Sequence, residues 1–99
     1  MCDTDLVKPI VWSAEKNDIL KAERGISFED VVFHIREGDI LETFDHPNQE
    51  RYPGQCVHAV VIEEYVYLVP FVETKDEVFL KTIIPSRKAT KRYQSKDDE

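Results

Sequence analysis

The chain has 99 residues, of which 41% are hydrophobic and 33% are charged, so it fits one globular domain and leaves no room for two. Its formal net charge of −7 argues against a protein that binds nucleic acid with its whole surface. Two cysteines exclude a disulfide-rich scaffold, and no apolar run approaches the ~20 residues that span a membrane.

The two ends of the chain are polar, and the N-terminus has neither a basic start nor a long apolar stretch. It therefore does not have the pattern of a secretory signal, and we expect a cytoplasmic protein. The ordered part of the single domain is expected over about residues 9–94, with frayed tails at 1–8 and 95–99.

The first expected element is a short strand over residues 10–12, which are β-branched or aromatic. Ser13 is a good helix N-cap and Gly25 a good C-terminal stop, so a mostly polar helix should run from Ser13 to about residue 23 or 24. A second helix should begin after Ser27 and end at Gly38. Its apolar residues recur at i, i+3, i+4 and i+7 and form one face: Phe28, Val31, Val32 and Ile35.

After residue 38 the pattern changes to alternating or continuous apolar residues, which favours strands. Pro85 should end the last strand, and Ser86 can cap a final helix to about Tyr93. Helices followed by a meander of strands indicate an α+β fold, with two N-terminal helices packed on an antiparallel sheet and a C-terminal helix. The expected strands are 39–44, 57–62, 65–72 and 78–84, with a loop at 46–54 and a tight turn at Glu63-Glu64.

Charge is distributed unevenly along the chain. Residues 1–80 carry seven basic and seventeen acidic side chains, a net charge of −10, whereas residues 81–92 carry five basic side chains and no acid. This pattern fits either a solvated helix whose cations complement its dipole or a site for anions such as phosphate. The five basic residues are Lys81, Arg87, Lys88, Lys91 and Arg92.

The 46–54 loop combines residue types that RNA cleavage without metal requires, although a plain polar surface loop has a similar composition. Such cleavage removes a proton from the 2′-hydroxyl, stabilises charge on phosphorus and protonates the leaving 5′-oxygen. His46 or Glu50 is the candidate general base or acid, Arg51 a phosphate ligand and Tyr52 a ring that stacks on bases. The chain has no cofactor motif and no metal-ligand spacing among its histidines, of which His34 and His58 are expected to be structural.

Three segments resemble the BrnT family of toxins: residues 12–17 (Trp-Ser-Ala-Glu-Lys-Asn), 24–29 (Arg-Gly-Ile-Ser-Phe-Glu) and 86–91 (Ser-Arg-Lys-Ala-Thr-Lys). The Glu50-Arg51 pair also resembles the family's Glu-Arg pair. The resemblance covers about residues 10–93 and rests on the order and spacing of these segments. The chain departs from the family pattern at four places. Ser13 replaces the usual Asp, and Arg24 stands where the family often has His. Lys81-Thr82 stands where an Arg is common, and Pro85 replaces a Ser.

The resemblance implies a RelE-like fold and the toxin half of a bacterial type II toxin–antitoxin pair, a ribonuclease that slows translation. It also implies a ribbon-helix-helix antitoxin as partner and contact with DNA only through that antitoxin. On this interpretation no cofactor is needed, Arg51, Arg87 and Lys88 hold the scissile phosphate, and Lys81 assists. Tyr52, Lys91 and Arg92 contact bases or flanking phosphates.

Two other functions are alternatives to the toxin. A non-catalytic interaction module of the same fold is favoured by the net charge of −7, because toxins of RelE-like fold are usually basic. A stand-alone metabolic enzyme is disfavoured, because the chain has neither a cofactor motif nor a paired-carboxylate signature.

Overall fold

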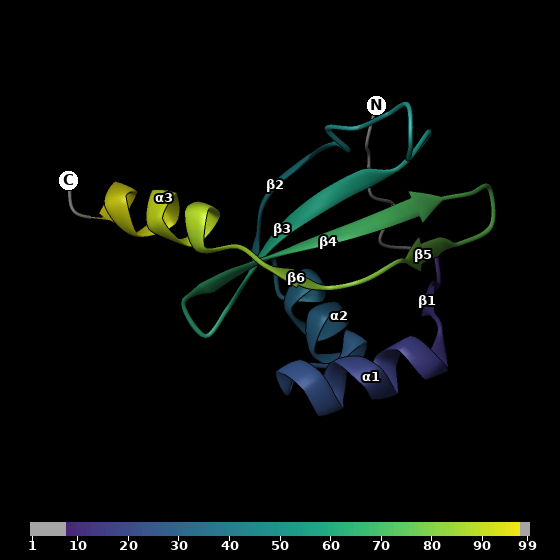
Figure 1. The fold of residues 1–99 in the computed structure, drawn as a ribbon, viewed down its shortest axis with the longest axis horizontal. Helices are drawn as coiled ribbons and strands as arrows, with labels where there is room; N and C mark the ends of the chain where they lie inside the picture. The colour runs from purple at the N-terminus through teal and green to yellow at the C-terminus, as the bar shows by residue number, and fades with distance from the viewer. Residues whose placement is uncertain (1–7, 98–99) are drawn as a thin grey trace.

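The computed structural model describes residues 8–97, so residues 1–7 of the expected tail 1–8 and residues 98–99 of the expected tail 95–99 lie outside the described residues. Residues 95–97, for which the sequence predicts a frayed tail, are helical. Over residues 8–97 the fold is α+β, with three helices and one mixed sheet of six strands (Figure 1). The elements are β1 (Ile10–Trp12), α1 (Ala14–Arg24), α2 (Phe28–Arg36), β2 (Ile40–Asp45), β3 (Cys56–Ile62), β4 (Tyr65–Glu73), β5 (Val78–Leu80), β6 (Ile84–Pro85) and α3 (Arg87–Asp97).

Both N-terminal helices begin at their predicted caps and α1 ends at its predicted glycine, whereas α2 ends at Arg36 with Glu37 as its C-cap, before the predicted stop at Gly38. The Ser13 hydroxyl accepts a hydrogen bond from the backbone N–H of Lys16, and Gly25 ends α1 in the left-handed conformation at φ 67°. At the start of α2, Ser27 and Asp30 form a reciprocal capping box. Both helices are therefore specified by local sequence.

The sheet has the strand order β1-β5-β4-β3-β2, with β6 pairing to β4 beside β5. All neighbouring strands are antiparallel except β1 and β5, which pair in parallel. The prediction of a purely antiparallel sheet is thus wrong at one edge. β1 comes before both helices in the chain, and its partner β5 comes after β4. The two paired strands are therefore joined by a long connection, which allows them to run in the same direction (Figure 1).

The predicted strand 78–84 is divided into β5 and β6. Val78 and Leu80 are buried, but the next buried residue is Ile83 rather than residue 82, so the alternation shifts by one position. The Ile83 carbonyl accepts a hydrogen bond from the Arg24 guanidinium of α1 instead of a strand partner. The break therefore depends on a contact between residues far apart in sequence.

The two faces of the sheet are covered differently. One face packs against α1 and α2 and forms the main core, to which the two helices contribute Leu20, Phe28, Val31 and Ile35. α3 lies against the opposite face and contacts β4 more than any other strand. It continues to Asp97, beyond the predicted end near Tyr93, since no glycine or proline follows to stop it. Within residues 8–97, no helix combines the length and apolar character that crossing a membrane requires.

Candidate functional site

α3 is attached to β4 through Ser86, which precedes the helix, and Thr90 in its first turn. The Ser86 hydroxyl accepts from the Ala89 N–H at 3.1 Å and so caps the helix. The Ser86 N–H donates to the Val66 carbonyl, and the Val66 N–H donates to the Thr90 hydroxyl at 2.9 Å. The helix that carries four of the five clustered basic residues therefore has a defined position on the sheet.

The basic side chains of α3 are presented to solvent. Arg87, Lys88, Lys91 and Arg92 are all exposed. Among residues 8–94, whose side chains are described, none of the four lies within 4.0 Å of an acidic group. They are therefore available to an anionic ligand without first breaking an ion pair.

Lys81, the fifth basic residue, lies on a different part of the sheet. It follows β5, is exposed, and places its ammonium 5.3 Å from the ring centre of Phe79. Its backbone N–H donates to the Pro70 carbonyl at 2.8 Å, which continues the pairing of this segment with β4. The predicted site residue Lys81 is thus beside β4 rather than on α3.

The 46–54 loop is folded on itself. The backbone N–H of Asn48 donates to Nδ1 of His46 at 3.0 Å, so a neutral His46 carries its proton on Nε2. The rings of His46 and Tyr52 lie 4.4 Å apart, and the Arg51 guanidinium carbon lies 5.7 Å from the centre of the Tyr52 ring. Glu50 and Arg51 are exposed. The loop therefore brings together His46, Arg51 and Tyr52, three of the four residues predicted for it.

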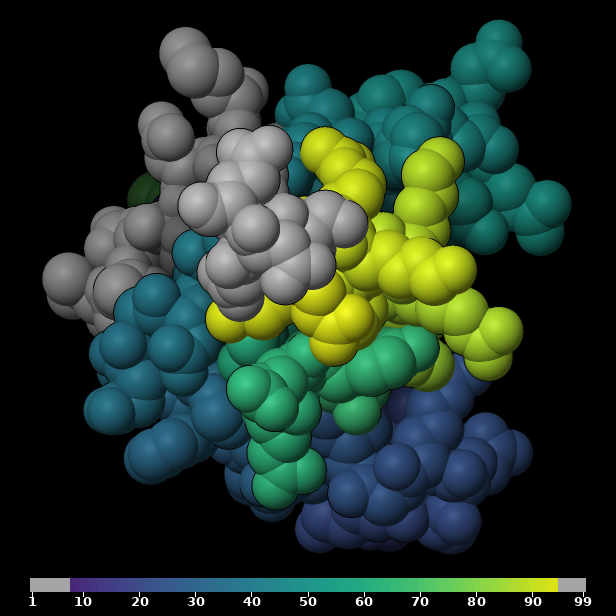
Figure 2. All heavy atoms as spheres, turned by 90° about the vertical axis from the view of Figure 1, so that its left-hand side faces the viewer, coloured from purple at the N-terminus to yellow at the C-terminus, as the bar shows by residue number. Residues whose placement is uncertain are grey.

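The loop and α3 meet at a groove on the outer face of the sheet. Two adjoining cavities of about 90 and 410 Å³ share four lining residues, Glu42, Ala59, Ala89 and Arg92. The larger cavity is also lined by Lys88 of α3 and Pro47 of the loop, and its volume lies in the ~300–1,000 Å³ range of ligand pockets. Figure 2 shows the side chains of α3 between the 46–54 loop above and the β3–β4 turn below.

Only part of the predicted site lines this groove. Lys88 and Arg92 line it, and the loop reaches it through Pro47. Its described lining does not include the other predicted site residues: His46, Glu50, Arg51, Tyr52, Lys81, Arg87 and Lys91. These residues lie on the loop, on α3 and after β5.

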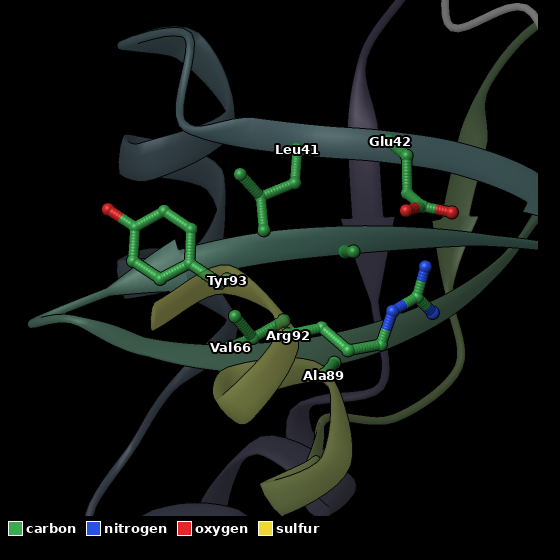
Figure 3. Close-up of a pocket in the computed structure, with 7 residues that line it drawn as sticks. Leu41, Glu42, Val66, Ala89, Arg92 and Tyr93 are labelled. Carbon is green, nitrogen blue, oxygen red and sulfur yellow. The ribbon is translucent and has the colours of Figure 1, made fainter. Parts of the chain in front are cut away.

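Of the seven residues that line the smaller cavity, sequence reasoning found only Arg92, and those it missed include Leu41, Glu42 and Tyr93 (Figure 3). The pairing of β2 with β3 is interrupted between Ile40 and Glu42, and this bulge lets the adjacent residues Leu41 and Glu42 line one cavity. Tyr93 could have been found from the helical spacing of Ala89, Arg92 and Tyr93 on one side of α3. The bulge has no comparable sequence signal.

The other histidines are engaged in the fold. Nδ1 of His34 lies 2.8 Å from a carboxylate oxygen of Asp39. His58 is 1% exposed, stacks on Phe71 at 4.1 Å and shares a hydrogen bond with the Thr43 hydroxyl. Burial lowers the pKa of His58 to about 4. Both residues thus have the structural role expected from the sequence.

Within the described part of the chain, no group of three or more His, Cys, Asp or Glu side chains is arranged to hold a metal ion. No protein-family model, curated protein or solved structure matches the chain.

Proposed function

We propose that this protein is the toxin of a type II toxin–antitoxin pair and that it cleaves RNA without a metal ion. The observation that carries the proposal is the meeting of Lys88 and Arg92 with Pro47 at one groove. These residues link the basic face of α3 to the loop that holds His46 and Arg51. Phosphodiester cleavage uses cations that stabilise charge on the phosphate and a group, such as an imidazole, that transfers a proton.

In the proposed reaction the 2′-oxygen attacks the neighbouring phosphorus while the bond to the 5′-oxygen breaks, which leaves a 2′,3′-cyclic phosphate. His46 or Glu50 takes the 2′-hydroxyl proton or delivers one to the 5′-oxygen. His46 can act as the acid only as an imidazolium, which requires that Nδ1 release the Asn48 N–H and take up a proton before Nε2 delivers one. Arg51, Arg87 and Lys88 stabilise the charge on the phosphate oxygens, assisted by Lys81.

Tyr52, Lys91 and Arg92 are proposed to contact bases or flanking phosphates, since stacking rings and cations on one surface bind single-stranded RNA. The proposed partner is a ribbon-helix-helix antitoxin, which would link the complex to DNA. The segments that resemble BrnT toxins support a RelE-like arrangement as part of the same proposal.

One observation favours the alternative, a non-catalytic module that binds a protein partner. Glu42 lines the groove together with Lys88 and Arg92, and an acid repels RNA phosphates. A partner with charges of both signs would complement such a surface. The two functions differ in a measurable way, because only the first breaks phosphodiester bonds.

The proposal is tested by induced expression of the wild type and of the double variant Arg87→Ala/Lys88→Ala, followed by analysis of cellular RNA. We expect growth arrest with RNA cleavage for the wild type and neither for the variant. Arg36→Ala/Lys75→Ala is the matched control, because it removes two exposed cations from α2 and the β4–β5 turn. Growth arrest by this control is expected to equal that of the wild type.

The loop is tested separately with Arg51→Ala and His46→Ala, using purified protein and labelled RNA. Both variants are expected to bind RNA and to cleave it more slowly, His46→Ala by about 10²-fold or more if the imidazole transfers the proton. Normal growth and intact RNA with folded wild-type protein would instead favour the binding module.

A further inference from the structure

The groove between α3 and the sheet has an uneven chemical lining. Its floor consists of small or aliphatic side chains, Ala59 and Ala89, with Val66 at one end and Leu68 at the other. Lys88 lies at the end with Leu68, Arg92 lines both cavities, and the opposite end holds Leu41 and Tyr93. A floor of this kind suits a flat apolar group, and the cations suit an attached anion.

Glu42 is the unexpected member of this lining. It is exposed, it lines both cavities, and in Figure 3 its carboxylate and the Arg92 guanidinium point toward one another. Within the described residues the two groups do not come within the 4.0 Å of an ion pair. A carboxylate weakens the binding of RNA phosphates, so Glu42 favours a ligand group that donates hydrogen bonds to it.

The backbone directs Glu42 to this position. Its strand, β2, departs from regular pairing with β3 immediately before Glu42, and the bulge lets Leu41 line the same cavity. Bulges of this kind re-aim side chains and are over-represented next to functional sites. Leu41 therefore lies toward Tyr93 at one end of the groove, whereas Glu42 lies where the two cavities adjoin (Figure 3).

The chemistry of a carboxylate selects among the four RNA bases. Its two oxygens only accept hydrogen bonds, so it pairs best with two adjacent donors. Guanine alone has two adjacent donors on its Watson–Crick edge, N1–H and the 2-amino group. Adenine and cytosine each place a ring acceptor beside their amino group, and uracil flanks its N–H with two carbonyls.

We infer that the groove between α3 and the sheet is a guanine site that selects the nucleotide at which RNA is bound. Glu42 accepts from N1–H and the 2-amino group, and Leu41 and Tyr93 contact the faces of the base. Lys88 and Arg92 bind the adjoining phosphate. The inference rests on the proposed function, since it concerns the substrate of the same surface.

The test is binding of single-stranded heptamers with 2′-O-methyl riboses, which cannot be cleaved by 2′-oxygen attack. The oligomers are seven uridines and the same sequence with a central guanosine, adenosine or inosine. The wild type is expected to bind the guanosine heptamer at least about fivefold more tightly than the uridine and adenosine heptamers. Inosine, which lacks the 2-amino group, is expected to lie between them.

Glu42→Gln is the matched variant, because an amide keeps the size of the side chain and offers only one acceptor oxygen. Its preference for guanosine over uridine is expected to fall below about twofold, since the bidentate pair is lost. Glu23→Gln on α1 makes the same charge change on the other face of the sheet and should keep the wild-type preference.

The outcomes separate this inference from the proposed function. Binding of all heptamers with equal affinity, or an unchanged preference in Glu42→Gln, would overturn the guanine site and leave the RNA-binding proposal standing. Failure of the folded wild type to bind any heptamer would overturn both. Competition of the bound guanosine heptamer by guanosine monophosphate, but not by uridine monophosphate, would support the site independently.

Discussion

The hydroxyl of Thr90 accepts a hydrogen bond from the backbone N–H of Val66 at 2.9 Å and donates one to the Ser86 carbonyl at 2.7 Å. Thr90 is 5% exposed and Val66 is fully buried. One side chain thus satisfies a buried strand donor and at the same time fixes the first turn of α3. The position of the basic helix on the sheet depends on this pair.

Thr90→Val is expected to destabilise the protein by about 1–3 kcal/mol, because it leaves the buried Val66 N–H without its partner while keeping the side-chain volume. The free energy of unfolding in urea measures the loss. Thr90→Ser retains the hydroxyl and should lose clearly less. Equal losses for the two variants would show that the methyl group, not the hydrogen bond, holds the helix.

A second buried polar residue, Asn17, joins α1 to α2. Its carbonyl oxygen accepts from the Phe28 N–H at 2.7 Å, and its amide donates to the Glu29 carboxylate at 2.8 Å. Asn17→Ala is expected to cost about 1–3 kcal/mol in the free energy of unfolding. Its exposed neighbour supplies the control, Asp18→Ala, for which a change within about 0.5 kcal/mol is expected.

The hydrogen bond that the Asn17 amide donates to Glu29 is also the main reason why the pKa of Glu29 lies below its ordinary value. In Asn17→Ala the pKa of Glu29 should therefore rise toward that value, which carboxyl NMR titration measures. An unchanged pKa would contradict the assignment of this hydrogen bond.

The parts of the fold that the sequence predicts well are those determined by neighbouring residues. Ser13, Ser27 and Gly25 make their caps with backbone groups three or four residues away, so their effects can be inferred locally. The apolar face of α2 is likewise set by helical spacing. The buried residues Phe28, Val31 and Ile35 all belong to it.

The features that could not be predicted depend on contacts between distant segments. The division of the strand 78–84 accompanies the burial of Ile83 in the core and the hydrogen bond of its carbonyl with Arg24 of α1. The parallel pairing of β1 with β5 depends on the whole topology. At the site, the basic residues were evident from composition, but the participation of Glu42 requires the β2 bulge and the packing of α3.

The buried imidazole of His58 predicts a pH dependence of stability. Burial lowers its pKa from 6.5 in the unfolded chain to about 4 in the folded protein. The unfolded chain therefore binds more protons than the folded protein as pH falls below 6.5. Stability is full above that pH and declines toward pH 4, by up to about 3 kcal/mol at 1.36 kcal/mol per pKa unit.

His58→Gln removes this titrating group and should give a shallower decline in the free energy of unfolding between pH 6.5 and pH 4. All other ionisable groups are the same in the two proteins, so the difference between the two curves isolates His58. Parallel curves would mean that His58 does not have the lowered pKa.

Substitutions in the β3–β4 turn are expected to stabilise the protein. Glu63 and Glu64 both have positive φ, 52° and 67°, as the central residues of a type I′ turn do, and neither is a residue that favours this conformation. Glu63→Asn/Glu64→Gly is expected to raise the free energy of unfolding by about 1 kcal/mol or more. Glu63→Ala/Glu64→Ala controls for the loss of two charges, and equal stability of the two variants would contradict the strain argument.

The salt dependence of RNA binding tests whether Lys88 neutralises a phosphate. For single strands, the slope of the logarithm of the binding constant against the logarithm of salt concentration changes by about 0.7 per phosphate contact. Lys88→Ala should therefore reduce the magnitude of the slope for the 2′-O-methyl uridine heptamer by about that amount. Lys75 lies in the β4–β5 turn, so Lys75→Ala should keep the wild-type slope. A variant at Lys88 that binds less tightly with an unchanged slope would indicate a contact to the base or sugar instead, because only charge neutralisation releases counterions.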